Sequence, residues 1–205
     1  MEKIEELIQR VRKIEHGFKG IEEEARDITE KNPVEGCLVI SRKLFSSDVY
    51  QARSLATFVL GAIAQISQEA LRFLREKVSK DQSWQVQEIL AKAFDRYCTD
   101  TGYEQALPVI EEWMKDENPN VRRAVTEGLR IWTNREYFKE NPGAAIRLLS
   151  QLKDDESEYV RKSVGNALRD ISRKHGDLVE SELRKWDTSD KRVKQTYGLA
   201  SRFLA

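Results

Sequence analysis

A helical motif recurs five times along this chain of 205 residues, and this repeat constrains the possible folds more than any other feature. The copies align on one apolar position, and successive copies lie 34, 35, 39 and 33 residues apart. Within each copy apolar residues recur at intervals of three and four, which is typical of one face of an α-helix and not of a strand. The aligned positions are Ala52, Val86, Val121, Val160 and Val193. A hairpin of this length buries its apolar face only against neighbouring copies, so the repeat predicts a stack of helices.

We therefore expect an all-α fold, an α-α superhelix (solenoid) of HEAT-like repeats. We expect residues 1–205 to form a single domain, in which residues 1–46 supply N-terminal capping helices and residues 47–205 supply the repeats. Each repeat should pair an outer A helix, such as residues 104–114, with an inner B helix that carries the motif. Three Asn-Pro pairs predict helix starts, with the Asn as cap and the Pro in the first turn: Asn32-Pro33, Asn118-Pro119 and Asn141-Pro142. An Asp stands five or six residues before four of the aligned positions: Asp81, Asp116, Asp154 and Asp187.

The composition excludes several classes of protein. Apolar residues make up 40% of the chain and charged residues 34%, which is too apolar for a disordered chain and too charged for a membrane protein. The first ten residues have no apolar signal core, so we expect a cytoplasmic protein without a membrane partner. We also expect a monomer. Cys37 and Cys98 lie on apolar helix faces as small core residues. No zinc-ligand spacing occurs, so we expect neither a metal nor a cofactor.

The charge is unevenly distributed although the net charge is zero. Residues 1–118 hold 17 Lys/Arg and 22 Asp/Glu, whereas residues 119–205 hold 18 and 13, so the two parts carry −5 and +5. This asymmetry favours a basic working surface in the C-terminal part, although ordinary scatter of surface charge would also produce it.

Basic residues recur on the polar face of the predicted B helices. The position after the aligned one is basic in four copies, and Gln87 is the exception: Arg53, Arg122, Arg161 and Lys194. The next position holds Arg123 and Lys162 in two copies, and Glu88 is the only acid there. A stack of repeats would align these cations, and such a row suits a phosphate backbone. Structural pairing with an Asp of the neighbouring repeat is the alternative.

Three segments resemble the AlkC/AlkD superfamily of HEAT-like-repeat DNA alkylation repair enzymes. The most specific is SEYVRKSVGNALRDISRKH, the second is NPNVRRAVTEGLRIW, and SWQVQEILAKAF is similar to the family helix that carries a catalytic carboxylate. The resemblance covers roughly residues 47–205. It implies B helices around double-stranded, alkylated DNA and excision of cationic N3- or N7-alkylpurines without base flipping.

The resemblance also implies site residues. The catalytic carboxylate falls on Glu88, and an aromatic residue that contacts the damaged nucleotide falls on Trp84. The DNA-binding residues that we predict are Trp84, Arg122, Arg123, Glu127, Arg161, Lys162 and Asn166. A second aromatic of the family would fall on Asn166, so the sequence departs from the pattern there. Glu127 is the second choice for the carboxylate, and it could equally neutralise the arginines beside it. Trp84 could instead be a core residue.

The sequence thus favours a monofunctional DNA glycosylase for alkylated purines and leaves two other functions open. One is a non-catalytic HEAT-repeat protein that binds distorted or branched DNA. The other is a protein-interaction scaffold. The fold alone does not decide between them, because function depends on the site.

Overall fold

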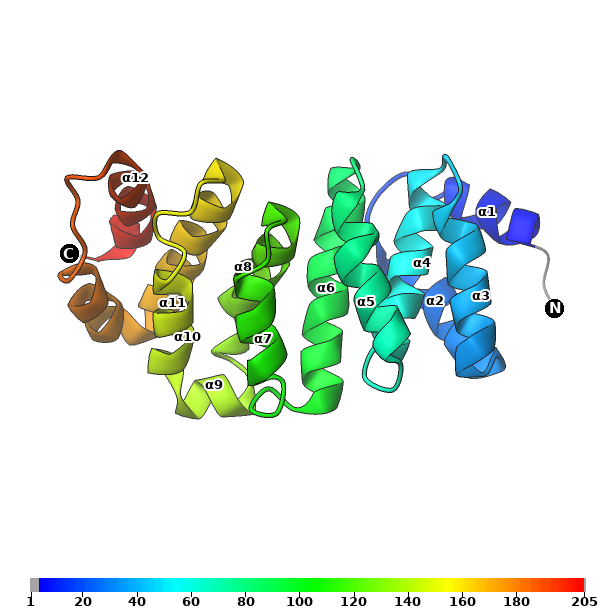
Figure 1. The fold of residues 1–205 in the computed structure, drawn as a ribbon, viewed down its shortest axis with the longest axis horizontal. Coiled ribbons are helices and arrows are strands. Elements are labelled where there is room, and N and C mark those ends of the chain that lie inside the picture. The colour runs from blue at the N-terminus through cyan, green and yellow to red at the C-terminus, as the bar shows by residue number, and fades with distance from the viewer. Residues whose placement is uncertain (1–3, 205) are drawn as a thin grey trace. The chain divides into compact units, whose positions relative to one another are not determined.

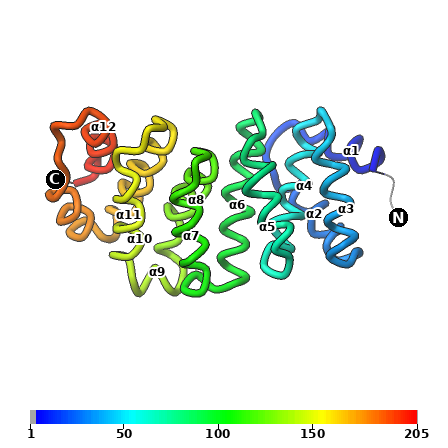
Figure 2. The backbone as a smooth tube through the Cα atoms, in the orientation of Figure 1, coloured from blue at the N-terminus to red at the C-terminus, as the bar shows by residue number. Residues whose placement is uncertain are grey.

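Helices account for all the regular secondary structure between residues 4 and 204, the part of the chain that the computed structural model describes. This confirms the predicted all-α solenoid class. Contacts within the chain divide it into two compact units, residues 1–101 and residues 102–205 (Figures 1 and 2). The division into one domain or more remains a prediction, and each unit is described by itself.

Unit 1 is organised around helix α4, which packs against α2, α3 and α6. The A helices α3 and α5 face the viewer in Figure 1, and α2 lies on the far side of α4. Residues 4–45 thus form three helices that contact α4, and their role as an N-terminal cap remains a prediction. The elements are α1 (Ile4–Arg12), α2 (Lys19–Lys31), α3 (Val34–Phe45), α4 (Tyr50–Ile63), α5 (Gln68–Glu76), the 3-10 helix η1 (Val78–Lys80) and α6 (Trp84–Thr101).

Unit 2 repeats the same layering, with A helices α7 and α10 in front of B helices α8 and α11 (Figure 1). Helix α11 is kinked at His175, whose φ of −131° and ψ of 46° are not helical. The segment after the kink leads to α12, which packs back on α11. The elements are α7 (Leu107–Met114), α8 (Pro119–Trp132), α9 (Glu136–Glu140), α10 (Pro142–Ser150), α11 (Glu158–Leu183), α12 (Lys191–Ala200) and the 3-10 helix η2 (Ser201–Phe203).

The loops before the B helices share one turn, in which an Asp side chain accepts the backbone N–H two residues later. The Asp/partner pairs are Asp81/Ser83, Asp116/Asn118, Asp155/Ser157 and Asp187/Ser189, at 2.8 to 2.9 Å. In the third of these loops the aspartate noted in the sequence, Asp154, is exposed, and its neighbour Asp155 makes the turn.

The predicted helix starts hold in part. Asn118 caps α8 through its side chain, which accepts the N–H of Asn120 at 2.9 Å, and Pro119 opens that helix. Pro142 opens α10, but the side chain of Asn141 donates to the carbonyl of Tyr137 instead of capping. Pro33 is itself the cap of α3 and not its first residue. The A helix expected over residues 104–114 begins later, at Leu107.

The core of unit 2 includes an aromatic cluster around Trp132, whose ring lies 5.4 Å from that of Phe138 and 5.3 Å from that of Tyr103. Trp113 and Trp186 are also buried, as expected for packing residues. Cys37 and Cys98 are buried free thiols, and burial raises the pKa of the Cys98 thiol well above its usual value. No helix in the described part of the chain is both long and apolar enough to cross a membrane.

Candidate functional site

Helix α6 presents Trp84 and Glu88 one turn apart on one face. Helix α6 packs on α4, and its other faces include the fully buried Val86, Ile89 and Phe94. Trp84 is the first residue of the helix, and its side chain is 62% exposed. Trp84 is therefore not a core residue, which was the alternative that the sequence left open. Glu88 is half-buried beside the same surface. The structure thus keeps a large ring and a carboxylate adjacent at the solvent edge of unit 1.

A cleft of about 610 Å³ lies at the next turn of the same helix, between α2, α4 and α6. Lys92 lines this cleft, and its ammonium lies 5.8 Å from the centre of the Phe18 ring. The remaining charges of the cleft are mixed in sign: Lys19, Glu22, Glu23, Arg26, Glu30 and Arg96. Such a balance gives the cleft no strong preference for anions.

Arg122 is held inside unit 2 by a bidentate ion pair with Asp155. The two bonds are 2.6 and 2.7 Å long, and a third nitrogen donates to the carbonyls of Asp116 and Glu117. The Asp155 side chain is 4% exposed and that of Arg122 is 13% exposed. Arg122 therefore pairs with an Asp of the neighbouring repeat, which was the alternative to the predicted phosphate contact. With its guanidinium used in this way, a phosphate contact of Arg122 does not fit the arrangement.

Arg161 is likewise committed to the protein. It is buried, its Nε donates to Gln195 at 2.9 Å, and its Nη1 donates to the carbonyls of Asp155 and Glu156. Arg53 repeats the pattern in unit 1, where it pairs with Asp81 at 2.6 Å. Gln87, at the same position of the next copy, makes only hydrogen bonds to the loop before its own helix. It donates to the carbonyls of Val78 and Asp81. Arg53, Arg122 and Arg161 therefore join repeats rather than face solvent, whereas Lys194 at the same position of the last copy is exposed.

The next position along the B helices differs in its two basic copies. Arg123 is buried, and its guanidinium carbon lies 4.4 Å from the centre of the exposed Tyr159 ring. Lys162 is exposed and pairs with Glu158 at 2.7 Å. This lysine keeps donors in solvent, whereas the arginine is stacked under an aromatic ring.

Glu127 pairs with both arginines beside it, as one of the two predicted roles requires. Its carboxylate lies 3.6 Å from Arg123 and 3.0 Å from Arg130. Asn166 is half-buried on α11, and its side chain supplies no aromatic surface.

Sequence reasoning missed an arginine cluster at the other end of these helices. Asp170 lies 3.0 Å from Arg130 of α8 and 3.1 Å from Arg169 of α11. Burial raises the pKa of this carboxyl, but hydrogen bonds from both guanidinium groups together lower it by more. The pKa of Asp170 therefore lies below its usual value. Arg169 and Arg173 also lie over the ring of Phe203, at 5.6 and 4.6 Å. Arg130 and Arg169 occupy equivalent positions in successive repeats, a signal that the sequence did contain.

The described residues include no group of three or more His, Cys, Asp or Glu side chains that could hold a metal ion.

Comparison with known proteins supports the sequence resemblance. Residues 17–201 match the family described as DNA alkylation repair enzyme. The crystal structure of AlkD2 from Streptococcus mutans is 51% identical, with a TM-score of 0.94 over 98% of this chain and 99% of that one. The smu.31 structure from Streptococcus mutans UA159 is 49% identical, with a TM-score of 0.92 over 99% of this chain and all of that one.

Two further relatives are more distant. The alkylpurine DNA glycosylase AlkC of Pseudomonas fluorescens, bound to DNA containing an abasic site analog, is 21% identical over all of this chain and 65% of its own. Its TM-score of 0.54 shows a shared fold. The uncharacterized protein YhaZ of Bacillus subtilis is 36% identical over 87 residues, which are 40% of this chain and 24% of that protein.

Proposed function

Because this chain belongs to the DNA alkylation repair enzyme family, we propose that it binds alkylated duplex DNA and hydrolyses the N-glycosidic bond of cationic N3- or N7-alkylpurines. Glu88 is the catalytic carboxylate of this proposal, and the base is not flipped out of the duplex. The observation that carries the proposal is the exposed ring of Trp84 one helical turn from Glu88.

The chemistry needs few groups. An alkylated purine already carries a positive charge, so its bond to the sugar is weakened and no strong general acid is required. The transition state resembles an oxocarbenium ion, as in glycoside hydrolysis. An ionised carboxylate beside the sugar stabilises that charge and orients the attacking water. Glu88 supplies the carboxylate, and the exposed Trp84 ring packs against the deoxyribose.

A second candidate function is DNA binding without excision, and one observation favours it. The guanidinium groups of Arg122 and Arg161, which were expected on phosphates, are used inside the protein. Fewer phosphate contacts mean weaker binding that depends less on salt. In this case Glu88 is a surface residue of a DNA-binding protein.

Base release under single-turnover conditions tests the proposal, with duplexes that contain 7-methylguanine or 3-methyladenine. Glu88→Gln keeps the size of the side chain and removes its charge, so excision should fall by ~100- to 1000-fold. Binding to the same duplex should stay level or tighten, because a charge that repels phosphate is lost. Glu111→Gln, on the exposed side of α7, is the matched control and should leave the rate unchanged.

The outcomes separate the candidates. Excision that survives Glu88→Gln would exclude Glu88 and move the carboxylate to Glu127. Wild-type protein that binds the duplexes but releases no base would establish the second candidate.

A further inference from the structure

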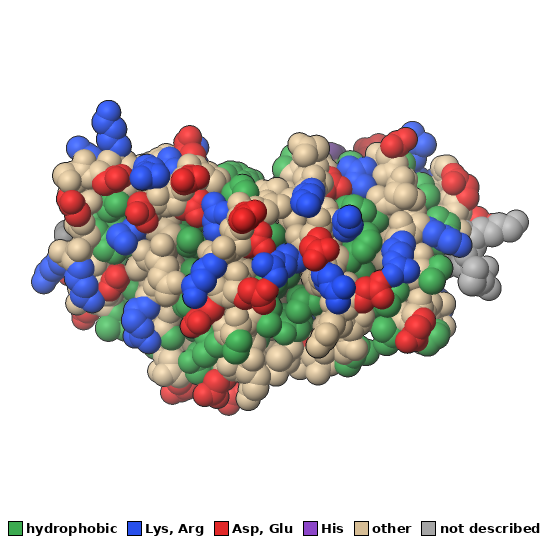
Figure 3. Space-filling view, in the orientation of Figure 1, with side chains coloured by type: hydrophobic (Ala, Val, Ile, Leu, Met, Phe, Trp, Pro, Cys, Tyr) green, Lys and Arg blue, Asp and Glu red, His purple; other side chains and the backbone are tan. Residues whose placement is uncertain are grey.

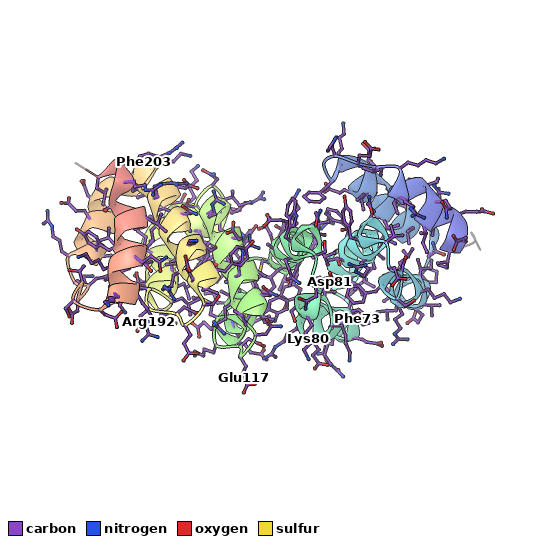
Figure 4. The ribbon with its side chains drawn as sticks, turned by 90° about the horizontal axis from the view of Figure 1, so that it is seen from above. Phe73, Lys80, Asp81, Glu117, Arg192 and Phe203 are labelled. Atoms are coloured by element: carbon purple, nitrogen blue, oxygen red, sulfur yellow. The ribbon has the colours of Figure 1, made fainter. Side chains whose placement is uncertain are left out.

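The side chain of Phe203 forms a platform for two arginines on unit 2. Phe203 lies in η2, which packs on α11, and its side chain is 50% exposed. The guanidinium carbons of Arg169 and Arg173, one turn apart on α11, lie 5.6 and 4.6 Å from the centre of its ring. Seen from above, Phe203 lies on the opposite side of unit 2 from Glu117 and Arg192 (Figure 4).

Stacking of this kind fixes a guanidinium while leaving its hydrogen-bond donors free. The ring covers one face of the planar group, but the N–H bonds point outward in its plane. These in-plane donors match two oxygens of a phosphate. Arg173 therefore holds its guanidinium donors in solvent, oriented to bind an anion.

The acids near this platform neutralise Arg169 but not Arg173. Asp170 is shared by Arg130 and Arg169. Within residues 4–204 neither Arg173 nor the exposed Arg202 pairs with a carboxylate. Asp177, beyond the kink of α11, pairs with neither of them in that range. Arg173 beside the exposed ring, and the exposed Arg202 that precedes Phe203 in the sequence, are thus uncompensated cations.

A purely structural role explains only part of this arrangement. Arg173 stands just before the kink at His175, where a cation interacts favourably with the end of the first helical segment of α11. That effect requires only a charge. It does not explain Arg202 on η2, or an aromatic ring that is stacked by two cations and still half-exposed.

We infer that Arg173 and Arg202 each bind a phosphodiester of duplex DNA, and that Phe203 is the residue that positions the guanidinium of Arg173. The inference rests on the DNA binding in the proposed function and is independent of base excision. The cationic contact surface of unit 2 then lies at the Phe203 end of α11, away from the buried Arg122 and Arg161.

The salt dependence of binding to a fluorescently labelled duplex tests this inference. Each lost phosphate contact lowers the slope of log K against log salt by about one unit, so Arg173→Gln with Arg202→Gln should lower it by about two. Lys191→Gln with Arg192→Gln makes the same change in charge at exposed positions, and Arg192 lies on the other side of unit 2 (Figure 4), so this pair should leave the slope unchanged. Phe203→Leu keeps an apolar side chain but removes the ring, and should weaken binding by about 2- to 5-fold.

Equal slopes for the two double variants, with wild-type binding intact, would overturn the inference and leave the proposed function standing. A lower slope in the Arg173/Arg202 variant supports the inference even if the wild type releases no base. Phe203→Leu that binds as tightly as wild type would remove the platform role of the ring. A wild-type protein that does not bind the duplex at all would overturn both proposals.

Discussion

At the scale of single residues, the aspartates before the B helices combine two tasks. Asp155 accepts the N–H of Ser157, which shapes its own loop, and it binds the guanidinium of Arg122 from the preceding repeat. A carboxylate that is 4% exposed needs such partners, because burial of an unpaired charge is costly. The Arg122–Asp155 ion pair therefore links two successive repeats and is called the joint below.

Removing one partner of this joint should destabilise unit 2. In Arg122→Gln the new side chain retains the local bonds that Gln87 makes in unit 1, but Asp155 loses its counterion. We expect the free energy of unfolding, measured in urea, to fall by about 3 kcal/mol. Arg122→Gln with Asp155→Asn should recover part of that loss.

Arg184→Gln provides the comparison, because it breaks an exposed ion pair with Glu180 that contributes less than about 1 kcal/mol. If Arg122→Gln proves no more harmful than Arg184→Gln, the joint does not stabilise the fold.

The sequence showed the residues of this joint but not their roles. Arg122 stands in a column of basic residues, and a column alone does not distinguish a guanidinium in solvent from one turned toward the next loop. The direction depends on the distance to Asp155 across the repeat interface, which only the packed structure supplies. By contrast, the position of Glu88 beside Trp84 follows from helical spacing alone, and the structure retains it.

At the scale of elements, the B helices approach one another through residues without side chains. Gly61 of α4 faces Ala93 of α6, and a Cβ added at Gly61 would lie 2.6 Å from the Ala93 Cβ and 2.7 Å from its Cα. Gly165 of α11 faces α12 in the same way. A Cβ added at Gly165 would lie 2.6 Å from the Cβ of Leu199. These glycines set how closely adjacent repeats pack.

Gly61→Ala should therefore destabilise unit 1 although Ala is the better helix former. Overpacking typically costs about 1–3 kcal/mol, which exceeds the gain of about 1 kcal/mol in helix propensity. Gly198→Ala on α12 is the matched control, because nothing lies within 4 Å of the added Cβ, and it should raise stability. Thermal unfolding of both variants measures the difference in sign. A stabilised Gly61→Ala protein would show that α4 and α6 can move apart at little cost.

Helix type and period could be predicted for these elements, because the apolar spacing and the Asn-Pro pairs are local signals. The packing of α2 against α4 could not, since residues 1–46 contain no copy of the repeat with which to align them. The kink at His175 was not predicted, although the segment SEYVRKSVGNALRDISRKH ends there and Gly176, a residue type common at helix ends, follows directly.

At the scale of the whole molecule, positive and negative side chains alternate over the face shown in Figure 3. This agrees with a net charge of zero and with the many ion pairs within each unit. The charge difference between residues 1–118 and 119–205 was a correct count, but part of the excess in the second part is used in ion pairs and stacks such as those of Arg122 and Arg169.

The carboxylates predict how stability depends on pH. The pKa values of Asp27, Glu158, Asp170, Glu182 and Asp187 lie below their usual values. A carboxyl whose pKa is lower in the folded state stabilises that state above its unfolded pKa, and this contribution is lost as the pH falls through the folded value. We therefore expect these groups to leave the melting temperature unchanged between pH 8 and about pH 5, and to lower it below about pH 4.5.

Melting curves measured from pH 7 to pH 3 test this prediction, with Asp170→Asn as the informative variant. The variant should melt at a lower temperature at pH 7 and lose less on acidification than wild type. Identical losses in the two proteins would mean that the ion pairs of Asp170 with Arg130 and Arg169 do not contribute to the acid sensitivity.

The joint between Arg122 and Asp155 also has a consequence for protein synthesis. The two residues are 33 positions apart, so at about 5–20 residues per second the ribosome delivers the aspartate roughly 2–7 s after the arginine. During that interval the guanidinium of Arg122 has the carbonyls of Asp116 and Glu117 in its own repeat but lacks its counterion. Each nascent repeat is therefore completed only when the loop of the next one emerges, and we expect a ribosome stalled between the two residues to hold an α8 hairpin that proteases still cut.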